Sequence, residues 1–151
     1  MKLLTRARMI PAAVVLAGAA TLLMPGSPAL AYISPPLVLL AEPESPARLV
    51  AQGAAVDVTV EYSCAADFMG IGLSVRERVG RAVASGSGGV SVPCDGRTHR
   101  TVIRVPADGG GPAFTRGSAA VETFVDGCRT GDDGLAVCAV DRTFDTIRIR
   151  R

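Results

Sequence analysis

One stretch of strict apolar–polar alternation constrains the fold of this chain more than any other feature. Within residues 56–64 every second side chain is apolar and every side chain between them is polar. The apolar positions are Val56, Val58, Val60, Tyr62 and Cys64. Successive side chains of a β-strand point to opposite faces, so this order gives one face that packs on a core and one that meets water. The stretch predicts a strand buried on one side.

Further short runs of the same period follow. We expect strands within residues 49–52, 71–75, 81–84, 90–94, 98–105, 119–125, 135–140 and 143–150. Ser85–Gly89 is expected to be a flexible loop, and the break in alternation at Arg76-Glu77-Arg78 predicts a bulge or an exposed strand end. No segment after residue 31 has helical periodicity. The pattern therefore predicts an all-β chain, an antiparallel immunoglobulin-like β-sandwich of about seven to nine strands.

Aliphatic side chains must fill most of such a core, because the chain contains no Trp, two Tyr and four Phe. The aromatic candidates for the core are Tyr62, Phe68, Phe114, Phe124 and Phe144.

The first 31 residues predict a signal peptide of the general secretory route. Lys2, Arg6 and Arg8 precede an uncharged apolar run, residues 9–24, and Ala29-Leu30-Ala31 supplies small residues for cleavage. The run is shorter than the roughly 20 residues that a spanning helix needs. We therefore expect cleavage, secretion into an oxidising extracellular space, and no membrane association afterwards.

Residues 32–47 are rich in proline and predict an extended leader, because proline has no backbone N–H to donate. The apolar stretch Leu37-Val38-Leu39-Leu40 within it is expected to dock on the domain as an edge segment, with a recognition tail as the alternative. The β-sandwich domain itself is expected to span residues 48–151.

The charge balance argues against nucleic-acid binding. The whole chain carries a net charge of +2, but loss of Lys2, Arg6 and Arg8 leaves thirteen arginines against fourteen acidic residues. Such a chain has no overall attraction for a polyanion. The absence of any other lysine, with abundant Ala, Gly, Val and Arg, is typical of the high-GC coding of actinobacteria.

The four cysteines, Cys64, Cys94, Cys128 and Cys138, all follow the expected cleavage point, and an even count in an exported chain favours two disulfides. Cys64 and Cys94 each end an alternating run on its apolar side. Cys128 and Cys138 flank the turn sequence Gly131-Asp132-Asp133-Gly134. We predict the pairs Cys64–Cys94 and Cys128–Cys138, both structural because no C-x-x-C occurs.

The competing pair is Cys64–Cys128, whose spacing resembles the inter-sheet bridge of antibody domains. No Trp is present to pack on that bridge, and Asp126 stands where those domains carry a tyrosine.

Residues suited to catalysis or metal binding are few. His99 is the only histidine, and a Ser-His-Asp triad with Asp95 would need a nucleophile that no Gly-x-Ser-x-Gly motif supplies. Four carboxylates gather around the last turn, at a spacing that matches no calcium-binding loop. They are Asp126, Asp132, Asp133 and Asp141. We predict no enzymatic activity, no metal and no cofactor.

The arginines are spread along the strands beside acidic residues and are expected to form solvated mixed-charge faces. Arg100 and Arg104 share one strand face and are the candidates for a surface that meets an anionic partner.

Four local patterns carry a resemblance to known proteins. They are Tyr62-Ser63-Cys64, the turn Val92-Pro93-Cys94-Asp95-Gly96, Arg116-Gly117, and Thr146-Ile147-Arg148-Ile149-Arg150. The chain resembles small secreted two-disulfide β-sandwich proteins of actinobacteria. In bulk features it is also similar to the neocarzinostatin-type apoproteins, exported seven-stranded sandwiches that hold a chromophore in a cleft. That resemblance implies small-ligand carriage and assigns no cleft residue here. The secreted subtilisin inhibitors share its size, export and two disulfides, with Pro93-Cys94-Asp95 in place of their reactive loop.

The expected function is that of a secreted, monomeric interaction module, because edge strands and loops are the functional surfaces that the pattern predicts. Its expected partner is an unknown extracellular protein or a component of the cell envelope. Small-ligand carriage and protease inhibition are the alternatives.

Overall fold

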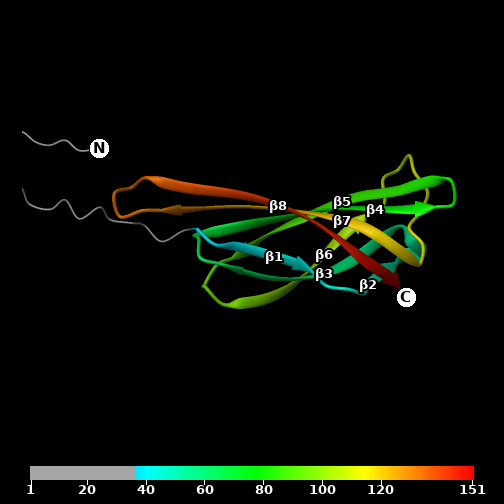
Figure 1. Ribbon diagram of the computed structural model, residues 1–151, viewed down its shortest axis with the longest axis horizontal. Helices are drawn as coiled ribbons and strands as arrows, with labels where there is room; N and C mark the ends of the chain where they lie inside the picture. The colour runs from blue at the N-terminus through cyan, green and yellow to red at the C-terminus, as the bar shows by residue number, and fades with distance from the viewer. Residues whose placement is uncertain (1–36) are drawn as a thin grey trace, which may run out of the picture. The chain divides into compact units, whose positions relative to one another are not determined.

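The computed structural model describes residues 37–151, which form eight strands and one short 3-10 turn (Figure 1). The elements are β1 (Leu39–Pro43), β2 (Ala47–Val50), η1 (Ala51–Gly53), β3 (Ala55–Cys64), β4 (Phe68–Val79), β5 (Ala82–Pro93), β6 (Thr98–Pro106), β7 (Gly117–Thr130) and β8 (Ala136–Arg150). The predicted signal peptide and the leader as far as Pro36 lie outside the described residues. Within the described part, no helix is long and apolar enough to cross a bilayer.

The strands form the all-β sandwich that the alternating pattern predicts. β1, β3 and β6 form one layer, and β8, β7, β4 and β5 form the other in that order, with antiparallel neighbours throughout. β2 links the two layers, because it pairs antiparallel with β3 and parallel with β8. On the far side, Gly86 of β5 bridges Ala107, the residue that follows β6.

The core contains the side chains that the alternation assigns to it. Val56, Val58 and Val60 of β3 are fully buried, and the facing layer contributes Met69, Ile71, Leu73 and Val75 from β4 and Val121, Val125, Ile147 and Ile149 from β7 and β8. Burying apolar surface of this kind is the main favourable term in folding, at about 25 cal/mol per Å². The period-two prediction for residues 56–64 is confirmed.

The sandwich begins inside the proline-rich segment. Leu39 of β1 pairs with Cys64 and is buried, so the apolar stretch 37–40 contributes an edge strand, as predicted. β2 begins at Ala47, which is also buried. Residues 39–47 therefore belong to the sandwich, which begins earlier than the predicted boundary at residue 48.

The glycine-rich stretch Ser85–Gly89 is not the loop that its composition suggests but the middle of β5. A Cβ atom on Gly86 would lie 2.1 Å from the carbonyl oxygen of Pro106, and one on Gly88 would lie 2.3 Å from that of Arg104. Glycine is needed here because the β6 backbone passes against this face of β5.

The predicted break in β4 is also wrong, because the strand pairs in unbroken register through Glu77. Glu77 points inward and is 2% exposed. Its carboxylate accepts hydrogen bonds of 2.7 Å from both the backbone N–H and the hydroxyl of Thr115. A buried carboxylate is tolerated when its acceptors are satisfied, and here it anchors the long β6–β7 loop.

Only two of the five aromatic core candidates, Tyr62 and Phe114, are buried. Phe114 lies in the β6–β7 loop, and its N–H donates to the carbonyl of Gly53. The other three, Phe68, Phe124 and Phe144, lie on the outer face of the β8–β7–β4–β5 sheet.

Candidate binding surface on the outer face of the β8–β7–β4–β5 sheet

Both predicted disulfides are present. Cys64–Cys94 joins the end of β3 to the segment after β5, and Cys128–Cys138 links facing residues of the β7–β8 hairpin. The described part of the chain holds no free cysteine. Two disulfides fit an oxidising compartment.

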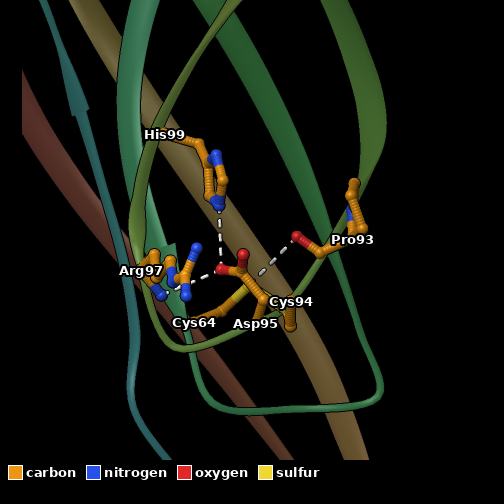
Figure 2. Close-up of a disulfide and its surroundings, with 6 residues drawn as sticks. All are labelled: Cys64, Pro93, Cys94, Asp95, Arg97 and His99. Carbon is orange, nitrogen blue, oxygen red and sulfur yellow. Dashed lines mark hydrogen bonds and ion pairs between the residues drawn. A yellow bond between two sulfur atoms is a disulfide. The ribbon is translucent and has the colours of Figure 1, made fainter.

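His99 does meet Asp95, beside the first disulfide (Figure 2). The His99 Nε2 atom lies 2.8 Å from a carboxylate oxygen of Asp95, which also accepts the N–H of Arg97. The His99 hydrogen bond is the main reason that the pKa of Asp95 is lowered. Among the described residues no serine hydroxyl bonds to His99, so the pair lacks the nucleophile of a triad.

The four carboxylates around the last turn do not converge. Asp133 accepts the N–H of Leu135, Asp141 accepts that of Arg142, and Asp126 lies over Gly70. No group of three potential ligand side chains gathers within residues 37–151.

Arg100 and Arg104 lie on the outer face of the other layer, where both are paired with acidic residues. Arg100 contacts Glu61 and Glu44. Arg104 shares the buried carboxylate of Asp57 with Arg48, each at 2.8 Å. The predicted anionic-partner surface is therefore a compensated mixed-charge face.

The hydrogen bond from Arg104 lowers the pKa of Asp57, opposed by burial and reinforced by Arg48. A carboxyl whose folded pKa lies below its unfolded value stabilises the fold above the unfolded pKa, near 4, and loses this contribution as pH falls through the folded pKa. Asp57→Asn should lower the free energy of unfolding by about 1–2 kcal/mol at pH 7, because the substitution removes the charge that both arginines contact. The loss stays small because both arginines are largely exposed to water.

Urea unfolding between pH 7 and pH 2 checks this expectation. The difference in free energy of unfolding between wild type and Asp57→Asn should become smaller below pH 4. A gap that stays constant to pH 2 would show that Asp57 does not titrate in this range.

Exposed apolar side chains gather on both faces of the β7–β8 hairpin instead. β4 begins at Phe68, the partner of Cys128, so within the described residues β7 and β8 form a two-stranded ladder beyond that disulfide, and the N–H of Thr130 donates to Asp67. Figure 1 shows the orange end of the hairpin extending past the β3–β4 connection. The exposed fractions are 67% for Leu135, 51% for Val137, 64% for Val140 and 73% for Phe144.

Two contacts made by Arg142 stabilise the middle of this surface. The guanidinium of Arg142 lies 5.8 Å from the centre of the Phe124 ring, and its Nε donates to Glu122 at 3.2 Å. Phe124 in turn covers Gly72 of β4. This cation–π contact holds the Phe124 ring on the same sheet face as Val140 and Phe144.

The free edge of β8 faces β1 across a small groove. β7 pairs with β8 along its whole length, but β2 reaches it only at Ile149 and Arg150, so within the described residues no strand pairs with the other edge of 136–147. A pocket of about 80 Å³ lies between β1 and residues 141–143. Thr123 lines it with a buried hydroxyl that has no hydrogen-bond partner in the described part of the chain.

Sequence reasoning named edge strands as functional surfaces but did not identify this edge. The sequence signal for this edge is that apolar residues occupy both faces of the last strand. Compared with known proteins, the chain matches no protein-family model, no curated protein and no solved structure.

Proposed function

We propose that this protein is an exported, non-catalytic binding module that holds an extended segment of a partner protein along the free edge of β8. The observation that carries the proposal is that, within the described part of the chain, no strand pairs with one edge of residues 136–147, which expose Val137, Val140 and Phe144. The proposed partner is an extracellular protein or a protein of the cell envelope.

An extended segment bound in this way gains backbone hydrogen bonds from the open edge and specificity from alternate side chains. Val137 points to the same face of β8 as the core residues Ile147 and Ile149, whereas Val140 and Phe144 point to the outer face. Apolar contacts are therefore available on both sides of such a segment. The Thr123 hydroxyl at the floor of the groove offers a hydrogen bond to a group that enters there.

Charged residues on β8 favour a selective partner over self-association. Asp141, Arg142 and Asp145 interrupt the apolar positions, and charges on an edge strand oppose indiscriminate strand pairing. This supports the proposal of a monomer that pairs with one class of segment.

Small-ligand carriage and protease inhibition receive less support. The pockets over Gly72 and beside Arg116 have volumes of about 260 and 290 Å³, and ligand-carrying pockets usually span about 300–1,000 Å³. The segment that would serve as an inhibitory loop is tied to the disulfide Cys64–Cys94, and the Asp95 carboxylate is engaged by His99.

The test is affinity capture from the native culture fluid with wild-type protein and with Val140→Asp/Phe144→Asp. A carboxylate on each exposed apolar position should reduce capture of the partner at least tenfold, because burying an unpaired charge at an interface is strongly unfavourable. A photo-crosslinker placed at position 140 should label the same partner.

The matched control is Val83→Asp/Val102→Asp, which adds the same charges at valines that are 54% and 59% exposed on other strands. It should capture the partner as wild type does. Equal capture by both double variants, with native circular dichroism, would show that β8 is not the binding edge.

A further inference from the structure

An arginine-rich surface lies on the outer face of the β8–β7–β4–β5 sheet, at the end opposite the turn of the β7–β8 hairpin. Arg148 and Arg150 of β8, Arg76 and Arg78 of β4, and Arg116 just before β7 are all exposed. We refer to these five residues as the arginine patch. They are distant in sequence, and the fold brings them together.

The strand register places the patch on one plane. Arg148 pairs with Ser118 on β7, and Ala120 of β7 pairs with Arg76 of β4. Alternate residues along a strand are about 7 Å apart and neighbouring strands about 4.8 Å apart. One face of the sheet therefore carries Arg148 and Arg150 on one side of β7, and Arg76 and Arg78 on its other side. Arg116, Arg148 and Arg150 also line a pocket of about 290 Å³ together with Gly117 and Ser118.

The arginines of the patch are not neutralised locally. Other arginines of the described chain, such as Arg48, Arg100 and Arg104, are paired with carboxylates. Within residues 37–151, none of the five guanidinium groups of the patch forms an ion pair. Arg78 has a long contact of 3.4 Å to the carbonyl of Gly80.

Three acidic residues lie near the patch, and one of them, Glu122 of β7, is paired with Arg142. Glu77 is buried beneath Gly117 and is engaged by Thr115. Asp108, at the β5 edge, bonds to the hydroxyl of Ser85, the strand partner of Arg76. The five positive groups exceed these three carboxylates, of which one is buried, one is peripheral and one is already paired with Arg142. This end of the face is therefore positive, although the exported chain as a whole would be slightly acidic.

We infer that the arginine patch binds a soluble polymer that carries repeated oxyanion groups, such as phosphate or sulfate. Guanidinium groups bind such oxyanions through paired N–H donors. Exposed, spread-out groups each contribute little, so binding depends on several contacts made at once and weakens with salt. The ligand is a polyanion other than single-stranded nucleic acid, because, within the described residues, no aromatic side chain on which bases stack lines the pocket beside Arg116 and Arg148.

The experiment measures binding of fluorescent dextran sulfate and of polyphosphate by wild type, by Arg116→Ala/Arg148→Ala and by Arg97→Ala/Arg100→Ala. Both double variants remove two exposed arginines, but the second pair lies outside the patch. The patch variant should bind both polymers about tenfold more weakly, a loss of roughly 1.4 kcal/mol. The control variant should bind within threefold of wild type, and raising the salt from 50 to 300 mM should weaken binding by wild type.

Binding of one polymer but not the other identifies the oxyanion and supports the site. Equal losses in both variants, no binding by wild type at 50 mM salt, binding of uncharged dextran, or binding only of single-stranded DNA or of anionic vesicles would each overturn the inference. The result is independent of the β8 edge, because Val140→Asp/Phe144→Asp should retain polymer binding whether or not that edge captures a protein.

Discussion

Replacing Phe114 with alanine is expected to lower the free energy of unfolding by about 3–5 kcal/mol, one of the two largest effects that we predict for this protein. The ring is 2% exposed and reaches the core from a loop, so its removal leaves a cavity that no neighbouring strand can close. The loop is fixed in place by the bond from the Phe114 N–H to Gly53 and by the hydrogen bonds of Thr115 to Glu77. Because the backbone cannot follow the lost side chain, the cavity persists.

Phe144→Ala is the matched control, since it removes the same ring from a position that is 73% exposed. We expect it to change the free energy of unfolding by less than about 0.5 kcal/mol. Urea denaturation of both variants at pH 7, followed by circular dichroism, gives the comparison. Similar losses for the two substitutions would mean that Phe114 does not complete the core.

Replacing both Cys64 and Cys94 with alanine is the second large effect, a loss of about 3.7 kcal/mol from loop-closure entropy alone. This disulfide joins the end of β3 to the segment that leads into β6, and both strands belong to the same layer. Its loss frees a closed loop of 31 residues in the unfolded chain. Thermal and urea unfolding of the oxidised double variant measure the effect.

The comparison is Cys128→Ala/Cys138→Ala, for which the same argument gives about 2.8 kcal/mol. That disulfide lies in an exposed hairpin, so we expect its removal to loosen residues 129–137 first and leave amide exchange in β3 and β4 slow. Slow exchange lost throughout the sandwich in this variant would contradict the separation of hairpin and core. A peptide map that links Cys64 to Cys128 in the native protein would overturn both expectations.

The strand positions followed from the sequence where the two faces differ. Val56–Cys64 alternates because one side meets the core and the other meets water, and the structure confirms that strand. The prediction failed at Ser85–Gly89, because glycine composition reports conformational freedom and not the carbonyl of Pro106 that passes against this face. It failed at Glu77 because a charged residue on the inward parity is buried only when distant donors reach it, as Thr115 does.

The candidate surfaces were less accessible to prediction than the fold. Both disulfides form as predicted, for different reasons. Cys128 and Cys138 face each other across one hairpin, whereas Cys64 and Cys94 are 30 residues apart and meet because β4 and β5 return the chain to the end of β3. The arginine patch depends on three strands that are neighbours only in the folded sheet. No reading of Arg76 or Arg148 within its own segment indicates that the two share a face.

The sequence by itself determined that the chain folds as a β-sandwich, which side chains of each strand share a face, and that Cys128 joins Cys138, because these follow from period two and from a short-range turn. Only the tertiary structure decided whether anything lies opposite a given face. Ile147 and Val137 are both apolar and lie on the same face of β8, yet one is 1% exposed and the other 51%. The difference arises because a second layer covers the end of β8 and is absent opposite most of its length within the described residues, so burial depends on a neighbour that the strand's own residues do not encode.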